Sequence, residues 1–170
     1  DTCIVHEPYS EPFYFGPERR HNRYDKDSDQ SEMGHITYES ATDKIFQDRA
    51  EKLVFVKDFP MYFEDYVPAR FASRKAFLQS MSHAFLFRHP YAAVKSHFKM
   101  LPDLTIEETG YHALLDFFKE VSDIKGEAPL LIEGDDFLRA PQAVYKQYCA
   151  YLSIPYDERN LSWEPRYIPE

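Results

Sequence analysis

A short apolar run that leads directly into a helical pattern does most to limit how this chain can fold. Residues 84–87 read Ala-Phe-Leu-Phe, which is the length of a strand buried on both faces, and apolar side chains then recur at helical spacing over residues 92–98. Pro90 suits the first turn of a helix, where its missing N–H costs nothing. The segment therefore predicts a strand, a tight turn and a helix.

Three further apolar runs, at residues 2–5, 53–56 and 128–133, also have the length and composition of buried strands. Helical patterns lie between them, and strands that alternate with helices predict an α/β fold. We expect one parallel sheet with helices on both faces, which makes three layers. The 170 residues fit a single domain over 1–170, with a long loop or lid at 11–39.

Local patterns also predict where helices start and stop. Ser40 with an acid three residues later indicates one helix start, and Thr105 with Glu108 indicates another, before a strongly amphipathic helix that ends near Gly126. Pro141 begins the last clear helix, and the residues from Gly134 to Leu138 are interpreted as a turn.

Composition excludes several classes of protein. The net charge of −9 argues against a general nucleic-acid binder, because neutralising phosphates needs a surplus of Lys and Arg. No apolar run approaches membrane-spanning length and no signal peptide is visible, so we expect no membrane span and a cytoplasmic protein. Cys3 and Cys149 match no metal-binding spacing and are interpreted as buried thiols. The oligomeric state stays open.

Two polar residues follow the strand at 84–87 in an informative pattern. Arg88 comes at its carboxyl end, where open α/β sheets bind ligands, and Ser96 comes eight residues later, about two helical turns on. A guanidinium and a hydroxyl placed in this way can both reach one phosphate. These residues predict a phosphate-binding site.

This pattern resembles a known motif. Residues 88–90, Arg-His-Pro, followed by Ser96, resemble the 3′-phosphate-binding motif of PAPS-dependent sulfotransferases, and His-Glu-Pro at residues 6–8 resembles a subgroup of bacterial and fungal sulfotransferase-like proteins. The resemblance implies a P-loop NTPase-like sulfotransferase fold, with PAPS as donor and PAP as product. It also implies that Arg88 and Ser96 hold the 3′-phosphate of the nucleotide.

The same resemblance implies that the phosphosulfate loop is missing from this sequence. In that family a phosphosulfate loop precedes the strand that ends in His-Glu-Pro, but this sequence contains no G-x-x-x-x-G-K-[ST] motif and only five Gly. We expect the chain to be a fragment, truncated at both ends. The alternative is a natural protein that lacks the loop.

Transfer of a sulfuryl group also needs a cation and a base. Lys57 follows a strand as a Lys does in cytosolic sulfotransferases, but Phe59 stands where those enzymes have a basic His. Glu7 is the candidate base and His6 the second, because an imidazole exchanges protons near neutral pH. The alternative is that Glu7 or His6 caps a helix or pairs with an Arg. Asp58 either orients Lys57 or Glu7, or is a surface turn residue.

The resulting hypothesis is a sulfotransferase that moves a sulfuryl group from PAPS to a hydroxyl or amine of a small-molecule acceptor. The alternative is a sulfotransferase-like scaffold without PAPS activity, which binds another partner or catalyses a different reaction. No metal is expected, since Asp135 and Asp136 suit a turn or a helix cap better than a cation. Arg19, Arg20 and Arg23 are interpreted as a solvated charged face.

Overall fold

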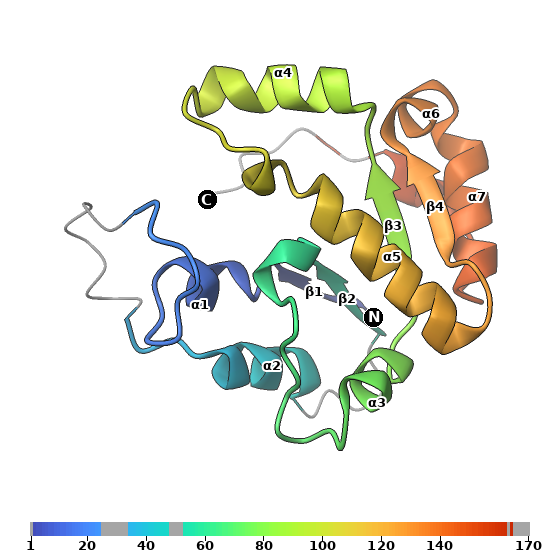
Figure 1. Ribbon diagram of the computed structural model, residues 1–170. Helices are drawn as coiled ribbons and strands as arrows, with labels where there is room; N and C mark the ends of the chain where they lie inside the picture. The colour runs from blue at the N-terminus through green and yellow to red at the C-terminus, as the bar shows by residue number, and fades with distance from the viewer. Residues whose placement is uncertain (1, 25–33, 48–52, 163, 165–170) are drawn as a thin grey trace.

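The computed structural model describes residues 2–24, 34–47, 53–162 and 164 (Figure 1). Four strands and seven α-helices follow one another in this part of the chain. In chain order they are β1 (Thr2–His6), α1 (Ser10–Tyr14), α2 (Tyr38–Phe46), β2 (Leu53–Lys57), α3 (Arg74–Gln79), β3 (Ala84–Phe87), α4 (Pro90–Met100), α5 (Tyr111–Lys125), β4 (Leu130–Glu133), α6 (Gly134–Arg139) and α7 (Pro141–Tyr151). Each of the four strands expected from the sequence is present, with ends that differ by no more than two residues.

The strands form two separate parallel pairs rather than one sheet. β1 pairs with β2, with His6 opposite Lys57, and β3 pairs with β4, with Phe87 opposite Glu133. The fold is thus a mixture of helices and short parallel strand pairs, compatible with a small α/β fold. A continuous sheet with three layers is not confirmed in the described residues.

One face of each strand pair is left open. Alternate side chains along the strands are exposed although they are apolar: Ile4 on β1 is 70% exposed and Leu86 on β3 is 65% exposed, and Phe55 and Leu131 follow the same pattern on the partner strands. Parallel strands are usually covered on both faces. The helices of the described residues therefore cover only part of the strand surface.

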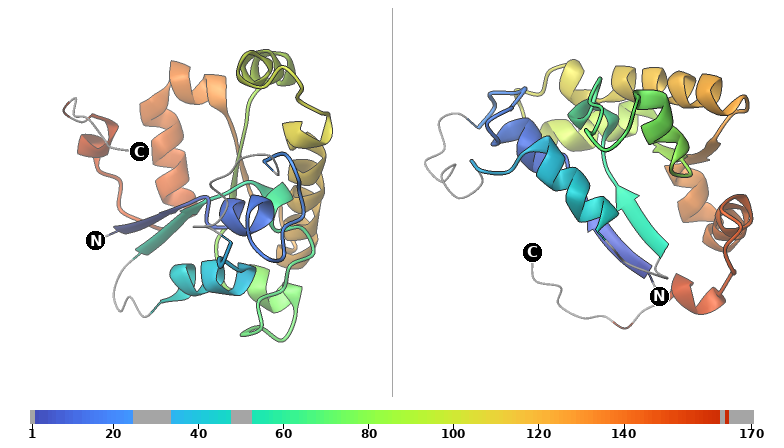
Figure 2. Two further views of the ribbon diagram at one scale, coloured as in Figure 1. Left: turned by 90° about the vertical axis from the view of Figure 1, so that its left-hand side faces the viewer. Right: turned by 90° about the horizontal axis from the view of Figure 1, so that it is seen from below.

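Helix α5 joins the two strand pairs. It runs between them in Figure 1, and Phe117 on this helix packs against both hydrophobic clusters of the protein. The first cluster surrounds Tyr9 and Tyr38 and includes side chains of β1 and β2, while the second includes Phe77 and Phe85. Figures 1 and 2 place α4 at one end of the molecule and α2 with α3 at the opposite end.

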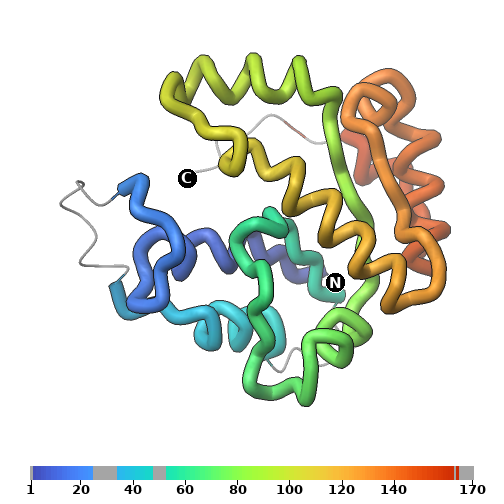
Figure 3. Tube along the Cα trace, viewed as in Figure 1, coloured from blue at the N-terminus to red at the C-terminus, as the bar shows by residue number. Residues whose placement is uncertain are grey.

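The chain runs from one side of the molecule to the other. In Figure 3 the first third of the chain lies on one side and the segment from β4 to α7 lies on the other, with residues from about 60 to 125 between them. No helix in the described residues is long and apolar enough to cross a membrane.

Helix ends follow the predicted signals with two differences. Pro90 and Pro141 begin α4 and α7, and Gly126 ends α5 with a left-handed φ of 75°. The capping box of α2, however, is formed by Thr37 and Ser40, so the helix begins three residues earlier than Ser40 predicts. The residues from Gly134 form the short helix α6 instead of a turn.

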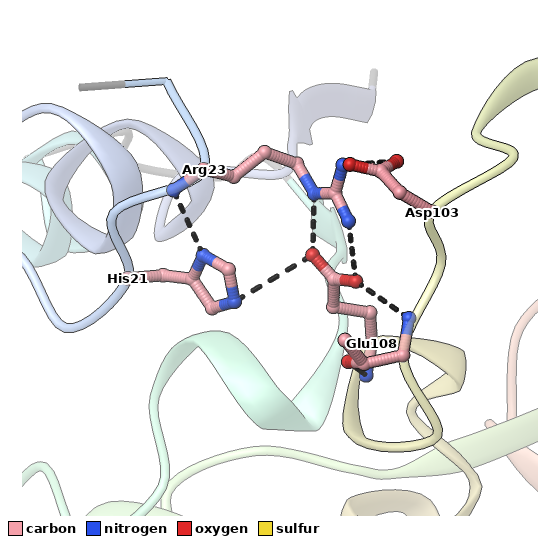
Figure 4. Close-up of polar contacts among 5 residues, drawn as sticks. His21, Arg23, Asp103 and Glu108 are labelled. Carbon is pink, nitrogen blue, oxygen red and sulfur yellow. Dashed lines mark hydrogen bonds and ion pairs between the residues drawn. The ribbon is translucent and has the colours of Figure 1, made fainter. Parts of the chain in front are cut away.

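A cluster of ion pairs and hydrogen bonds joins two distant segments and was not expected from the sequence (Figure 4). The Arg23 guanidinium makes two hydrogen bonds to the buried Glu108 carboxylate and one of 2.9 Å to Asp103, and His21 Nε2 lies 3.5 Å from Glu108 Oε1. Only 12% of the Arg23 side chain is exposed. The interpretation of Arg23 as part of a solvated charged face is therefore wrong, because its charge is neutralised inside the fold.

Candidate functional site

Glu7 and Lys57 meet where β1 and β2 end. The backbone N–H of Glu7 donates a 2.7 Å hydrogen bond to the carbonyl of Lys57, which extends the parallel pairing by one residue. Glu7 has a φ of 42°, which lies in the left-handed region that residues other than Gly rarely adopt. Its carboxylate contacts the Lys57 ammonium directly. The ends of β1 and β2 thus bring these two side chains together, and their role in binding or catalysis stays a prediction.

The surroundings of this ion pair differ on its two sides. His6 is largely exposed, with Nε2 3.8 Å from Glu7 Oε1, so it lies beside the carboxylate without a hydrogen bond to it. On the other side, the Lys57 Nζ lies 4.0 Å from the centroid of the Phe59 ring. This cation–π contact gives Phe59 a role at the position where a basic His was expected by resemblance.

Asp58 ties the ends of the two strands together. Its Oδ2 accepts a 3.0 Å hydrogen bond from the backbone N–H of Tyr9, and its Oδ1 accepts one of 2.8 Å from the N–H of Phe59. Burial raises the pKa of Asp58 from its ordinary value of 3.8 to about 7, although these two hydrogen bonds oppose the shift. Asp58 is therefore not a surface turn residue, because it fixes the segment that follows Glu7.

Arg88 lies at the corresponding end of β3. Its Nε is 3.5 Å from Asp135 Oδ1, at the start of α6, and about half of each side chain is exposed. The Tyr111 hydroxyl donates a 2.7 Å hydrogen bond to the carbonyl of Arg88, which fixes the backbone at the end of the strand. Among the described residues the guanidinium thus has one carboxylate partner, and it is accessible from solvent.

Ser96 is exposed on α4, two turns after Pro90. Among the described residues its hydroxyl has no hydrogen bond, and no contact joins it to Arg88. The structure places both residues near the same strand-to-helix turn but does not bring them together. Binding of one phosphate by both Arg88 and Ser96 stays a prediction.

The start of α5 links the two strand ends. Tyr111, the first residue of the helix, contacts Arg88, while Met61, in the short 3-10 helix after Lys57, lies beside Gly110. Both strand pairs thus end close to the amino end of α5. The role of Tyr111 was not foreseen, because no local pattern connects it with Arg88, which lies 23 positions earlier.

Other candidates have structural partners. His83 Nε2 lies 2.9 Å from the carbonyl of Leu78, and burial lowers the pKa of His83. Cys149 is buried and Cys3 is half-buried, and no disulfide joins them. Within the described residues no group of three or more His, Cys, Asp or Glu side chains could hold a metal ion.

Comparison with known proteins gives one match. The chain is 31% identical over 88 residues to branched-chain-amino-acid aminotransferase-like protein 2 of Arabidopsis thaliana, a match that covers 52% of this chain but 15% of that protein. No family model matches the chain. No solved structure matches it.

These findings correct the assignment to the PAPS-dependent sulfotransferases. The protein that matches is aminotransferase-like by name, and no sulfotransferase supports the resemblance based on Arg88 and Ser96. The pattern consists of Arg-His-Pro at a turn between a strand and a helix and of one Ser six residues after that proline. The motif was therefore too short to establish a family.

Proposed function

We propose that this chain catalyses transfer of a sulfuryl group from PAPS to a hydroxyl or amine of a small molecule, at the edge formed by Glu7 and Lys57. The proposal concerns the reaction that the side chains could perform and depends on no family. The observation that carries it is the direct contact between the Glu7 carboxylate and the Lys57 ammonium at the ends of two paired strands. A base and a cation side by side are what transfer of an anionic group requires.

In the proposed reaction the donor competes with Glu7 for Lys57. The ammonium moves to the sulfuryl group and the phosphate oxygen that leaves, and this frees the carboxylate to accept a proton from the acceptor. The acceptor oxygen or nitrogen then forms a bond to sulfur while the bond from sulfur to the phosphate oxygen breaks, which releases PAP. His6 is the second candidate for the base because it lies 3.8 Å from Glu7.

Arg88 and Ser96 are the proposed contacts to the nucleotide. The accessible guanidinium of Arg88 has a single carboxylate partner, at 3.5 Å, which a phosphate could replace. The Ser96 hydroxyl is exposed and without a hydrogen bond in the described residues. Both would contact the 3′-phosphate of PAPS.

Thermal unfolding with adenosine 3′,5′-bisphosphate tests the donor site. A ligand at 100 times its dissociation constant stabilises the folded state by about 2.7 kcal/mol, which for a chain of this size corresponds to roughly 5–10 °C. Arg88→Ala should abolish the shift and Ser96→Ala should reduce it. Adenosine 5′-monophosphate, which lacks the 3′-phosphate, is the control and should give no comparable shift.

Transfer of labelled sulfuryl to a phenol tests the chemistry. Glu7→Gln and Lys57→Ala should each lower turnover at least a hundredfold while the bisphosphate still binds. A folded protein that shows no stabilisation by the bisphosphate contradicts the proposal.

The second candidate is a binding protein without sulfuryl transfer. The closed pair of Glu7 with Lys57, and the Phe59 ring against the same ammonium, favour it because each charge already has a partner. Binding of the bisphosphate without turnover would support this candidate. The name of the Arabidopsis relative adds amino-group transfer as a different reaction to assay.

A further inference from the structure

The outer face of α4 has an unusual composition for this protein. The helix contains no buried residue, and Tyr91 and Phe98 are 72% and 53% exposed. Lys95 and Lys99 lie on the same helix, and no Asp or Glu occurs between Arg88 and Leu101, although the chain carries a net charge of −9. A basic and aromatic surface thus stands on an acidic protein.

These side chains form one continuous surface. Tyr91, Val94, Lys95, Phe98 and Lys99 line a shallow hollow of about 340 Å³, which we call the α4 face. They are three or four residues apart, so they point to the same side of the helix. The Lys95 Nζ lies 5.7 Å from the centroid of the Tyr91 ring.

The position of α4 leaves this surface accessible. In Figure 1 the helix lies along one end of the molecule, with α5 and the two strand pairs below it. At protein interfaces an apolar anchor in a hollow supplies most of the affinity, and complementary charges at its rim supply specificity.

We propose that the α4 face binds an acidic segment of another protein, which inserts an aromatic or aliphatic side chain between Tyr91 and Phe98. The apolar hollow would take the anchor, and Asp or Glu residues on either side of the anchor would pair with Lys95 and Lys99. Charge complementarity selects this partner because every residue of α4 that is charged at neutral pH is a lysine. This inference uses residues other than those of the proposed transfer site.

Two other occupants fit less well. A symmetric dimer would place the α4 faces of two copies together, with Lys95 and Lys99 opposite lysines, and both copies carry a net charge of −9. An anionic membrane would attract the two lysines but repel the rest of the chain. A short acidic segment meets only the basic surface, and its side chain fills a concave site.

A peptide array tests the proposal. Ten-residue peptides in which one Phe, Tyr, Trp or Leu is flanked by Asp and Glu are compared with peptides in which Ser replaces the apolar residue or Lys replaces the acids. The folded protein should bind the acidic peptides with an apolar anchor at least tenfold more tightly than either control set. Binding should weaken about fivefold between 50 and 300 mM salt, because exposed charges are screened.

Two lysine variants test whether the peptide binds at the α4 face. Lys99→Glu should lower the affinity about tenfold, whereas Lys75→Glu, an equal change in charge at an exposed position on α3, should leave it within twofold. Phe98→Ser should lower the affinity by a similar factor through loss of the apolar contact. Circular dichroism and thermal unfolding establish that each variant is folded.

Three results would overturn the proposal. The first is an array with no preference for acidic peptides that carry an apolar anchor. The second is binding to vesicles of phosphatidylcholine and phosphatidylserine that Lys99→Glu abolishes, without peptide binding. The third is a dimer, seen by analytical ultracentrifugation, that dissociates in the Lys99→Glu variant.

Discussion

Asp58 accepts a hydrogen bond from the backbone N–H of Tyr9, 49 positions earlier in the chain, at 3.0 Å. The bond joins the segment after β1 to the residue that follows Lys57 at the end of β2. Since Glu7 lies two residues before Tyr9, Asp58 helps to hold the Glu7 carboxylate against the Lys57 ammonium. The half-buried carboxylate also makes this contact sensitive to pH.

Asp58 should make the stability of the protein fall as the pH rises from about 4 to about 8. Its pKa is raised to about 7 in the folded protein, so the folded state keeps a proton that the unfolded chain loses near 3.8. The stabilisation from this proton is complete below the pKa of Asp58 in the unfolded chain. It is lost as the pH rises through the pKa of Asp58 in the folded protein. The difference in unfolding free energy between wild type and Asp58→Asn should therefore decrease by up to about 3 kcal/mol between pH 4.5 and 8.

Urea unfolding at several pH values measures this difference. Asp116→Asn is the control, because Asp116 is 78% exposed and should show no comparable dependence. A difference in unfolding free energy between wild type and Asp58→Asn that stays constant with pH would contradict the prediction.

The Arg23–Glu108 pair should be important for stability. Only 4% of the Glu108 side chain is exposed, so Arg23→Met would leave a buried carboxylate without its main partner, at a cost of about 3–5 kcal/mol. The double variant Arg23→Met, Glu108→Met should lose less than the sum of the single variants. Chemical denaturation of all four proteins gives the coupling energy, and additive losses would show that the pair does not act as a unit.

The same pair predicts a loss of stability in acid. Arg23 lowers the pKa of Glu108 from its ordinary value of 4.5 to about 2. The stabilisation is present above the unfolded pKa and is lost as the pH falls through the folded pKa. Thermal unfolding between pH 5 and pH 2 should show a steeper decline for wild type than for the double Met variant, and parallel curves would contradict this.

The backbone conformation of Glu7 should lower the stability of the folded protein. A left-handed φ of 42° costs a residue with a side chain roughly 1 kcal/mol, a cost that Gly does not bear. Glu7→Gly and Glu7→Ala both remove the carboxylate, but only Ala keeps the backbone strain. Glu7→Gly should therefore be about 1 kcal/mol more stable than Glu7→Ala in urea unfolding, and equal stability would mean that the φ is not strained.

Two neighbouring residues of β3 should respond differently to truncation. Phe85 is 4% exposed and belongs to the second cluster, so Phe85→Ala should cost about 3–5 kcal/mol. Leu86 is 65% exposed, so Leu86→Ala should change stability by less than about 0.5 kcal/mol. Unfolding of the two variants is compared directly, and a large loss for Leu86→Ala would mean that another surface covers this face.

The sequence predicted the local elements well because short-range physics determines them. Apolar runs defined the strands, and Pro90 and Pro141 marked helix starts. The prediction was wrong at Gly134, where Gly and Asp suggested a turn. There the Glu133 side chain accepts a hydrogen bond from the N–H of Asp136 and caps a short helix instead.

Long-range relationships were harder to predict. Phe117 packs against both hydrophobic clusters, and no local pattern predicts this contact or the separation of the strands into two pairs. The Arg23–Glu108 pair joins residues 85 positions apart, and a run of charged residues gives no sign of which side chain becomes buried. At the candidate site the sequence placed Glu7 and Lys57 each at the end of a strand, but no local pattern predicted their direct contact or the burial of Asp58.

The pairing of His6 with Lys57 limits how this protein can change through insertions. The chain between β1 and β2 carries the buried residues of α1 and α2, so added residues should leave the strand alignment intact only where that chain is exposed, as at residues 17–20. One residue added inside β1 would instead shift every later position of that strand against β2 and turn Glu7 to the opposite side. Tolerance of length variation should therefore differ between this exposed turn and the strands.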